Sequence, residues 1–211
     1  MGLRERKKQA TRVAIADTAL GLFLARGFDQ VTVADVARAA QVAVNTVFNY
    51  FPTKEDLFFD RQDEVVHRLA RAVDARRPGE SPAAAVRRAF VEALDRNEPT
   101  LGLSPDVTAF WQTVDASPAL QARLRLMAEQ TEAVLAAKLA EVAGTADDDP
   151  APRLLAAAIA GVDRALHAEI RRRIQAGEDP ADVRRVVRRA AAGVDADVLA
   201  VVCGQTPAGP A

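Results

Sequence analysis

The sequence predicts an all-α protein of about nine helices, and three observations favour this fold class. Apolar residues recur every three to four positions in most segments of the 211 residues, which places them on one face of a helix. Alanine, the strongest helix former, is the most frequent residue. No segment alternates apolar and polar residues between turn signals, as a half-buried strand would.

Composition excludes several other classes of protein. With 49% hydrophobic and 27% charged residues and a net charge of -1, the chain is neither disordered nor collagen-like. The single cysteine, Cys203, cannot form an internal disulfide, and two histidines are too few for an ordinary zinc site. The sequence has neither a secretory signal nor a long uncharged apolar run, so we expect a cytoplasmic protein with no membrane partner.

The first two helices are predicted from their apolar faces and their end signals. A helix over 9–26 carries one apolar face and is followed by Gly27. A helix of two turns over 33–39 begins at Thr32, and Asp35 lies three positions further on as the partner of a capping box.

A third helix over 44–51 follows a turn of three residues and ends before Pro52. We expect its buried side to consist of Val47, Phe48 and Phe51. The polar residues of this helix then face outward.

The rest of the chain is predicted to form six more helices. The first spans 54–76, begins with a capping box of Thr53 and Asp56, and is expected to connect two domains. The others, separated by loops with proline, glycine or acidic residues, are predicted near 82–97, 104–115, 117–143, 152–176 and 179–202.

Basic residues gather at the N-terminal end, within residues 1–12. Glu5 is outnumbered there by Arg4, Arg6, Lys7, Lys8 and Arg12. A basic arm on an otherwise neutral chain attracts a polyanion. We expect three of these side chains to contact DNA phosphates: Arg4, Lys7 and Lys8. A solubilising terminus is the alternative.

The two short helices and their turn form a helix-turn-helix, whose second helix can enter the major groove of DNA. Amide and hydroxyl groups hydrogen-bond to base edges, whereas a merely solvated helix face more often carries Glu, Lys and Arg. The expected base-reading residues are Val44, Asn45, Thr46 and Asn49. The expected phosphate contacts, from hydroxyl and ammonium groups at helix ends, are Thr32, Tyr50 and Lys54.

Residues 9–60 resemble the DNA-binding domain of the TetR family of bacterial transcriptional regulators. The family's Tyr-Phe-x-x-Lys-x-x-Leu pattern is present as Tyr50-Phe51-Pro52-Thr53-Lys54-Glu55-Asp56-Leu57. Two positions depart from the family: Gln41 replaces the usual turn glycine, and Ala43 replaces the serine that usually caps the recognition helix. A missing cap costs about 1 kcal/mol locally. Both departures concern the turn rather than the reading residues.

The resemblance implies an all-helical homodimer with an N-terminal DNA-binding domain and a divergent C-terminal domain for a small inducer. We therefore expect a helix-turn-helix domain over 1–53, a connecting helix over 54–76, a ligand-binding and dimerisation domain over 77–204, and a flexible tail over 205–211. The implied function is that of a regulator, most often a repressor, that leaves a palindromic operator when a hydrophobic or aromatic molecule binds.

An inducer pocket is expected among apolar side chains, because ligand cavities are mostly apolar with a few polar groups. The candidate lining residues are Phe90, Leu94, Phe110, Trp111, Val114, Leu124, Met127 and His167. Plain core is the alternative for each of them.

The last two long helices form the dimer interface in the family's layout. The candidate interface is one apolar stripe of Leu155, Ile159, Val162, Leu166 and Ile170. A core stripe within one subunit has the same pattern, so that alternative stays open.

Two other function classes are alternatives. A helical small-molecule-binding protein that does not bind DNA is supported only by Gln41 and Ala43. A metalloenzyme has one Glu-x-x-His pair, Glu64 with His67, whereas a di-metal bundle needs two, and His167 has no such partner. We therefore expect no catalytic residue, no metal and no cofactor.

Overall fold

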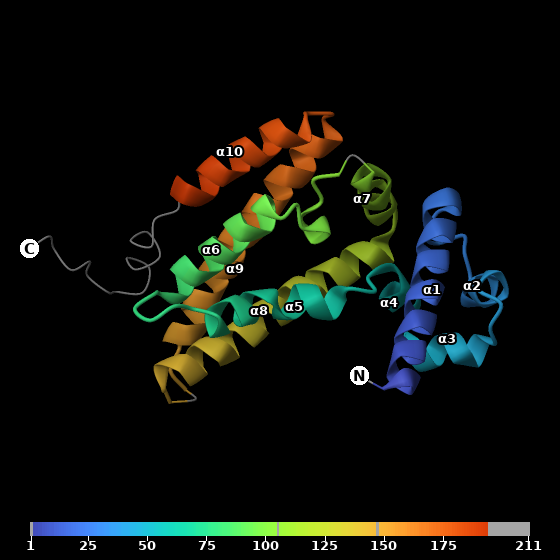
Figure 1. Ribbon diagram of the computed structural model, residues 1–211, viewed down its shortest axis with the longest axis horizontal. Helices are drawn as coiled ribbons and strands as arrows, with labels where there is room; N and C mark the ends of the chain where they lie inside the picture. The colour runs from blue at the N-terminus through green and yellow to red at the C-terminus, as the bar shows by residue number, and fades with distance from the viewer. Residues whose placement is uncertain (1, 105, 147, 194–211) are drawn as a thin grey trace, which may run out of the picture. The chain divides into compact units, whose positions relative to one another are not determined.

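The computed structural model describes residues 2–104, 106–146 and 148–193. Within these ranges the chain forms α-helices and one short 3-10 helix and contains no strand, so the predicted all-α fold is confirmed (Figure 1). The helices are α1 (Leu3–Arg26), α2 (Val33–Ala39), α3 (Val44–Tyr50), α4 (Lys54–Phe58), α5 (Gln62–Asp74), α6 (Pro82–Asp95), η1 (Pro99–Leu101), α7 (Val107–Ala116), α8 (Pro118–Ala143), α9 (Ala151–Gln175) and α10 (Pro180–Gly193). None of these helices is both long enough and apolar enough to cross a membrane.

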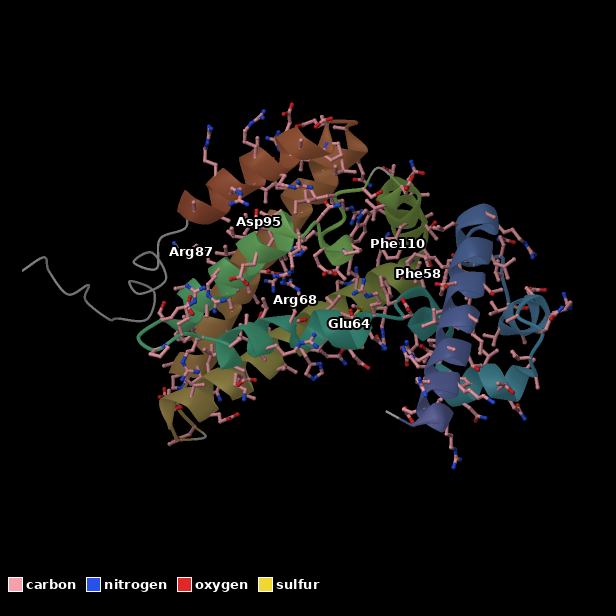
Figure 2. All side chains as sticks on the ribbon, viewed as in Figure 1. Phe58, Glu64, Arg68, Arg87, Asp95 and Phe110 are labelled. Atoms are coloured by element: carbon pink, nitrogen blue, oxygen red, sulfur yellow. The ribbon has the colours of Figure 1, made fainter. Side chains whose placement is uncertain are left out.

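The described chain divides into two compact units. The N-terminal unit contains the residues up to 63 together with 109–125, and the C-terminal unit contains 64–108 together with the residues from 126 onward. The boundaries predicted from the sequence assign 109–125 to the ligand-binding domain instead. The reason for the difference is aromatic packing: Phe110 of α7 stacks on Phe58 of α4, with ring centroids 4.5 Å apart (Figure 2).

A cluster of phenylalanine rings forms the core of the N-terminal unit. Helix α1 packs against α2 and α4, and α2 packs against α3. The buried ring of Phe23 lies 5.0 Å from that of Phe28 and 6.1 Å from that of Phe58, measured between centroids. Phe59 meets Phe58 edge-on at 5.1 Å. Each such tilted or edge-on pair adds about 0.5–1.5 kcal/mol beyond the area it buries.

Helix α1 begins at Leu3, so the prediction of a helix starting at residue 9 after a separate basic arm is wrong. Residues 3–12 contain neither proline nor glycine, and their Arg, Lys, Gln and Ala residues favour helix. Gly2, in an extended conformation, precedes the first turn. The basic side chains of this segment therefore lie on a regular helix.

The start of the predicted connecting helix is confirmed. The Thr53 N–H donates to the carboxylate of Asp56 at 2.9 Å, and the Asp56 N–H donates to the Thr53 hydroxyl at 3.2 Å. This capping box satisfies two of the N–H groups that a helix start leaves unpaired. Helix α4 accordingly begins at Lys54.

The prediction of one continuous helix over 54–76 is wrong, because α4 ends at Phe58 and α5 begins at Gln62. Phe59 leaves the helical region, with φ -101° and ψ 53°. The residues three and four positions after Phe58 are Arg61 and Gln62. In a continuous helix these polar side chains would lie on the same face as the buried Phe58. The break avoids this.

The remaining helices lie close to their predicted positions. Helices α6, α8 and α9 begin and end within two residues of the predicted ranges. Helix α7 begins at Val107, three residues later than expected, and η1 was not predicted. Helix α10 is described as far as Gly193, so the rest of the predicted 179–202 helix lies outside the described residues, as do Cys203 and the tail over 205–211.

Two clusters of buried, mostly aliphatic side chains form the core of the C-terminal unit. Helix α10 packs against α6 and α9. The first cluster joins α5, α6, α8 and α9 through Leu69, Ala72, Val73, Val86, Leu135, Leu139, Ala156, Ile159 and Ala160. The second joins α6, α9, α10 and the segment around η1 through Phe90, Leu94, Leu101, Leu103, Ile170, Ile174, Val183, Val187 and Ala191.

An ion pair with a buried carboxylate joins α5 and α9 of the C-terminal unit. The guanidinium of Arg68 donates two hydrogen bonds to the carboxylate of Asp163, one of them 2.6 Å long. Asp163 is only 4% exposed. Because a buried carboxylate without its partner is strongly unfavourable, this pair fixes the register of α5 against α9.

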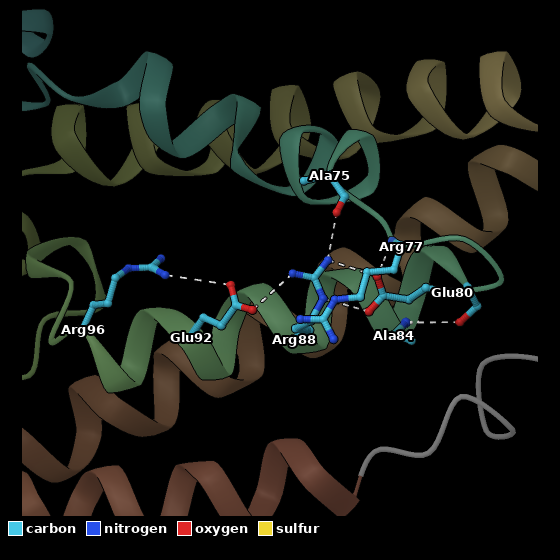
Figure 3. Close-up of polar contacts among 8 residues, drawn as sticks. Ala75, Arg77, Glu80, Ala84, Arg88, Glu92 and Arg96 are labelled. Carbon is cyan, nitrogen blue, oxygen red and sulfur yellow. Dashed lines mark hydrogen bonds and ion pairs between the residues drawn. The ribbon is translucent and has the colours of Figure 1, made fainter.

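Arg88 fixes the turn between α5 and α6 (Figure 3). Its guanidinium donates to the Ala75 carbonyl at 3.0 Å, to the Glu80 carboxylate at 2.9 Å and to Glu92 at 3.2 Å. Glu80 also accepts from the Arg77 N–H at 2.8 Å. These hydrogen bonds to Arg88 and Arg77 lower the pKa of Glu80 to about 2.

Candidate nucleic-acid interface

Helix α2 is the first helix of the helix-turn-helix, and a capping box fixes its start. The Thr32 hydroxyl donates to the Asp35 carboxylate at 2.6 Å and accepts from the Asp35 N–H at 3.1 Å. Hydrogen bonds from Thr32 lower the pKa of Asp35 to about 2, so the carboxylate stays charged. Thr32 is exposed, as a phosphate contact must be, but its hydroxyl proton is already used within the cap.

The turn between α2 and α3 carries both departures from the family pattern. Gln41 has φ 56°, a left-handed conformation that glycine adopts without steric cost and a residue with a Cβ adopts at a cost of about 1–2 kcal/mol. Ala43, at the N-cap of α3, offers no side-chain oxygen, and no side-chain cap bond is present there. The turn nevertheless closes, because the Val42 N–H donates to the Ala37 carbonyl at 2.9 Å.

Helix α3 buries one residue completely and exposes most of the others. Val47 is 0% exposed and anchors the helix in the core of the N-terminal unit. The outward face contains the predicted reading residues Val44, Asn45 and Asn49, all of them exposed. Amide groups on such a face can donate to and accept from base edges.

Phe48 corrects the sequence prediction for α3. It was expected on the buried side, but it is 46% exposed and lies one turn after Val44, which is 38% exposed. The 3.6-residue period explains the difference: Val47 and Phe51 are four residues apart and share the buried face, while Phe48 is rotated from Val47 by about 100°. The outward face of α3 therefore carries two apolar residues besides its two asparagines.

Thr46 and Tyr50, one turn apart, are half-buried and lie between the core and the outward face of α3. Helix α3 ends at Tyr50, and Phe51 is extended, with φ -137°, as expected of a residue before proline. The Tyr50 phenol therefore lies at the C-terminal end of α3.

Lys54 lies at the first position of α4, close to the aromatic core. Its ammonium is 4.2 Å from the centre of the Phe28 ring and 5.8 Å from that of Phe23. These cation–π contacts hold the stem of a half-buried lysine in one place. An ammonium oriented in this way is suited to meet a phosphate at a fixed position.

The three basic residues predicted to contact phosphates, Arg4, Lys7 and Lys8, occupy one face of α1, since they lie three and four positions apart. All three are exposed. Arg12, one turn further on, has a different role: it donates to the Asp60 carbonyl at 2.7 Å and lies 4.8 Å from the centre of the Phe51 ring. It therefore joins α1 to the segment that follows α4.

The eight predicted pocket residues are divided between the two units. Four lie in the N-terminal unit, namely Phe110, Trp111, Val114 and Leu124, and the other four lie in the C-terminal unit, namely Phe90, Leu94, Met127 and His167. Phe110 belongs to the aromatic core, with its ring 6.0 Å from Phe59 and 5.2 Å from Trp111.

A cavity of about 40 Å³ lies between α6, α9 and α10 of the C-terminal unit. Its walls are formed by Ala83, Ala84, Val86, Arg87, Phe90, Ile159, Val162, Asp163, Leu166 and Ala191. Among the residues predicted to line a pocket, Phe90 contributes directly, and His167 meets the Phe90 ring edge-on at 5.5 Å. This volume suits a few water molecules rather than a drug-sized ligand.

Asp163, one of the two charged residues that line this cavity, also contacts Arg68 and His167. Burial raises the pKa of the Asp163 carboxyl, but the nearby His167 and the Arg68 hydrogen bond outweigh it, so the pKa lies below its ordinary value. Burial also lowers the pKa of His167, against the opposing effect of Asp163. His167 Nδ1 lies 2.8 Å from the Asp163 carbonyl. The Asp163 carboxylate therefore stays negatively charged, and the Arg68 guanidinium neutralises this charge.

The stripe proposed as a dimer interface faces the chain's own core. Ile159 and Ile170 belong to the two buried clusters, and Leu155 and Leu166 pack against them. Val162 lines the cavity. The sequence left both alternatives open, and the structure places the stripe in the core because α6, α8 and α10 cover this side of α9.

The Glu64 and His67 pair predicted for a metalloenzyme lies on α5, and both residues are exposed. Over residues 2–193, with 105 and 147 excepted, no group of three or more His, Cys, Asp or Glu side chains is placed to hold a metal ion.

Comparisons with known proteins identify the fold and the family. Residues 15–60 match the family described as "Bacterial regulatory proteins, tetR family", and residues 80–198 match the "MftR C-terminal domain". The structure of native NalD, the secondary repressor of the MexAB-OprM multidrug efflux pump in Pseudomonas aeruginosa, superposes with a TM-score of 0.55 at 19% identity, covering 87% of this chain and 96% of NalD. It has the same fold.

Two curated relatives are transcriptional regulators of the helix-turn-helix type. TcmR of Streptomyces glaucescens is 32% identical over 172 residues, which are 80% of this chain and 76% of TcmR. LuxR of Vibrio harveyi is 45% identical over 67 residues, which are 32% of this chain and 28% of LuxR. The resemblance seen in residues 9–60 thus extends over most of the chain, which belongs to the TetR family of bacterial transcriptional regulators.

Proposed function

We propose that this chain is a homodimeric, cytoplasmic repressor that binds a palindromic operator through α3 and leaves it when a small molecule binds the C-terminal unit. The observation that carries this proposal is the outward face of α3. Asn45 and Asn49 are exposed on a short helix whose opposite side, at Val47, is anchored in the core. A rigid helix that exposes amides is suited to the major groove.

In this proposal, some of the DNA-contacting residues contact bases and the others contact phosphates. Val44, Asn45, Thr46 and Asn49 contact base edges, which differ between base pairs. Six others hold phosphates and thereby set the register without reading sequence: Thr32, Tyr50, Lys54, Arg4, Lys7 and Lys8. The Thr32 hydroxyl must exchange its hydrogen bond to Asp35 for one to a phosphate oxygen. It is therefore the weakest of the six phosphate contacts.

Two copies of the chain bind two half-sites about one DNA turn apart in this proposal. The stripe from Leu155 to Ile170, which packs against each chain's own helices, is not the interface in this proposal. The outer faces of α9 and α10 are more suitable, because they expose large apolar side chains, with Leu154 at 56% and Val186 at 36%.

The ligand binds at the cavity beside Phe90 in this proposal. Its walls are largely aliphatic, which favours a hydrophobic or aromatic molecule, and Arg87 and Asp163 supply polar groups that fix its orientation. A cavity of about 40 Å³ must widen to admit such a molecule. The ligand can release DNA only to the extent that it binds the widened conformation more tightly than the present one.

A gel-shift series on the purified chain tests the proposal. The probe is the promoter DNA that flanks the chain's own gene, with random duplex as competitor and several salt concentrations. We expect binding that resists the competitor and weakens with salt by about 0.9 in log–log slope for each phosphate contacted. Light scattering should give the mass of a dimer.

Two variants separate the roles. Asn49→Ala should reduce the preference for the promoter over random DNA, whereas Lys54→Ala should weaken both complexes by a similar factor. If neither DNA is retained at low salt, the chain is a helical small-molecule-binding protein instead. A monomer at micromolar concentration contradicts the half-site arrangement.

A further inference from the structure

The exposed pair of Val44 and Phe48 on α3 has no structural explanation within the chain. Phe48 is 46% exposed and Val44 38%, and the two lie one turn apart on the same side of the helix. The neighbouring Phe51, Phe58 and Phe59 are all buried. An exposed phenylalanine gains little for the folded state, so its place on the outward face points to a contact with another molecule.

The side chains around this pair indicate which molecule covers it. Asn45 and Asn49 lie next to Val44 and Phe48 along the helix, and both are exposed. The face is therefore a mixture of two apolar side chains and two amides, without any charged residue. Exposed cations lie elsewhere in the same unit, on α1 at Arg4, Lys7 and Lys8.

This mixture matches one kind of base pair in the major groove. An A·T pair presents the N7 acceptor and N6 donor of adenine, which suit the amide of Asn, and the C5-methyl group of thymine, which suits an apolar side chain. A G·C pair offers no methyl group there, and its guanine edge is best met by Arg or Lys, which α3 lacks.

We propose that α3 reads A·T base pairs, with Phe48 and Val44 packed on thymine methyl groups and Asn45 and Asn49 hydrogen-bonded to adenine. The proposal rests on the role of α3 as the reading helix given above, and it adds Phe48, which the sequence had assigned to the core, as a residue that sets sequence specificity. The half-site recognised by α3 is accordingly rich in A·T pairs.

Replacing thymine by deoxyuridine tests the proposal, because this change removes the methyl group and leaves base pairing unchanged. The full-length chain first selects its preferred duplex from a randomised pool, and each thymine of the selected half-site is then replaced singly. Loss of one buried methyl contact should weaken binding of the unmodified chain about fourfold at one or two positions. Phe48→Ala should weaken binding to the thymine duplex by at least that factor.

The decisive result is that the Phe48→Ala variant loses its sensitivity to the thymine methyl group. Phe48→Ala should bind the thymine and deoxyuridine duplexes with the same Kd at the position that Phe48 covers, while Phe48→Leu, which keeps an apolar side chain, should retain part of the difference. Leu24→Ala is the matched control, since Leu24 is an exposed apolar residue on α1, and it should keep the full fourfold effect.

Three outcomes contradict the inference, and they can be distinguished. If the chain selects a sequence but every deoxyuridine replacement leaves its Kd unchanged, the methyl contacts are absent although the proposed function stands. If the selected half-site is rich in G·C pairs, the A·T preference is wrong. If no sequence is selected at all, the reading role of α3 fails, and this inference fails with it.

Discussion

The two units of the molecule bury different kinds of side chain. Seven of the eight phenylalanines, together with the one tryptophan, belong to the N-terminal unit, and Phe90 alone belongs to the C-terminal unit. The core of the N-terminal unit is a set of rings in tilted, stacked and edge-on contact. The C-terminal unit instead combines small and aliphatic side chains with the buried pair of Arg68 and Asp163.

This difference suits the two tasks proposed for the units. Interlocked aromatic rings have few alternative arrangements, so they hold α3 in one orientation toward DNA. Small side chains leave space that can change shape, and the cavity beside Phe90 lies among alanines of α6 and α10. The N-terminal unit is therefore expected to be the more rigid of the two, and the C-terminal unit the one that adapts to a ligand.

The largest effect is expected from Phe58→Ala. Phe58 is 2% exposed and touches Phe23, Phe28, Phe59 and Phe110, so its removal leaves a cavity among four other rings. We expect the free energy of unfolding of the N-terminal unit to fall by about 4 kcal/mol. Urea unfolding followed by the fluorescence of Trp111, the single tryptophan, measures this unit.

Phe48→Ala is the control for that experiment. It removes the same type of side chain from the outward face of the same unit, where Phe48 is 46% exposed, and should change the unfolding free energy by less than about 0.5 kcal/mol. Equal effects of the two substitutions would show that the ring cluster is not what stabilises the N-terminal unit.

The helix-turn-helix of the N-terminal unit could be predicted closely, because its signals are local. The capping boxes at Thr32 and Thr53 each act over three positions, and Pro52 determines the end of α3. Phe48 is one exception, besides the start of α1 and the break between α4 and α5. A short apolar run such as Val47-Phe48 does not reveal which residue faces the core, since this depends on the rotation of α3 against α1 and α2.

The C-terminal unit could be predicted only as a series of helices. Its defining contacts join residues far apart in the sequence: Arg68 meets Asp163 across 95 positions, and Arg184 meets Asn97 across 87. Periodicity shows that one side of α9 is apolar but not which helix covers it. The stripe from Leu155 to Ile170 was for this reason consistent with an interface as well as with the core in which it lies.

The second prediction concerns the ion pair of the C-terminal unit. Asp163→Asn keeps the size of the side chain but leaves the Arg68 guanidinium without its charged partner. We expect the C-terminal unit to lose about 3 kcal/mol of unfolding free energy. Hydrogen exchange of amides in α5 and α9 should speed up, while the unfolding midpoint reported by Trp111 should shift less.

Two further variants make this result specific. Asp95→Asn breaks the exposed pair with Arg188 on α6 and α10 and should have almost no effect, because exposed ion pairs contribute little. The double variant Arg68→Met with Asp163→Leu should recover most of the lost stability, since an apolar pair can replace a buried ionic one. A double variant as unstable as Asp163→Asn would contradict this electrostatic explanation.

The smallest effect is expected at the left-handed residues; among the described residues, each unit has one that is not glycine. Gln41 has φ 56° in the turn before α3, and Asn97 has φ 53° after α6. Asparagine tolerates this conformation better than glutamine does, because its short side chain can hydrogen-bond locally. Gln41→Gly should therefore raise the unfolding free energy of the N-terminal unit by about 1 kcal/mol, and Asn97→Gly should change that of the C-terminal unit by only a few tenths.

The fluorescence of Trp111 measures the first change and hydrogen exchange in α6 the second. Equal gains at both sites would mean that the strain lies in the backbone conformation itself and not in the glutamine that replaces the family's usual glycine.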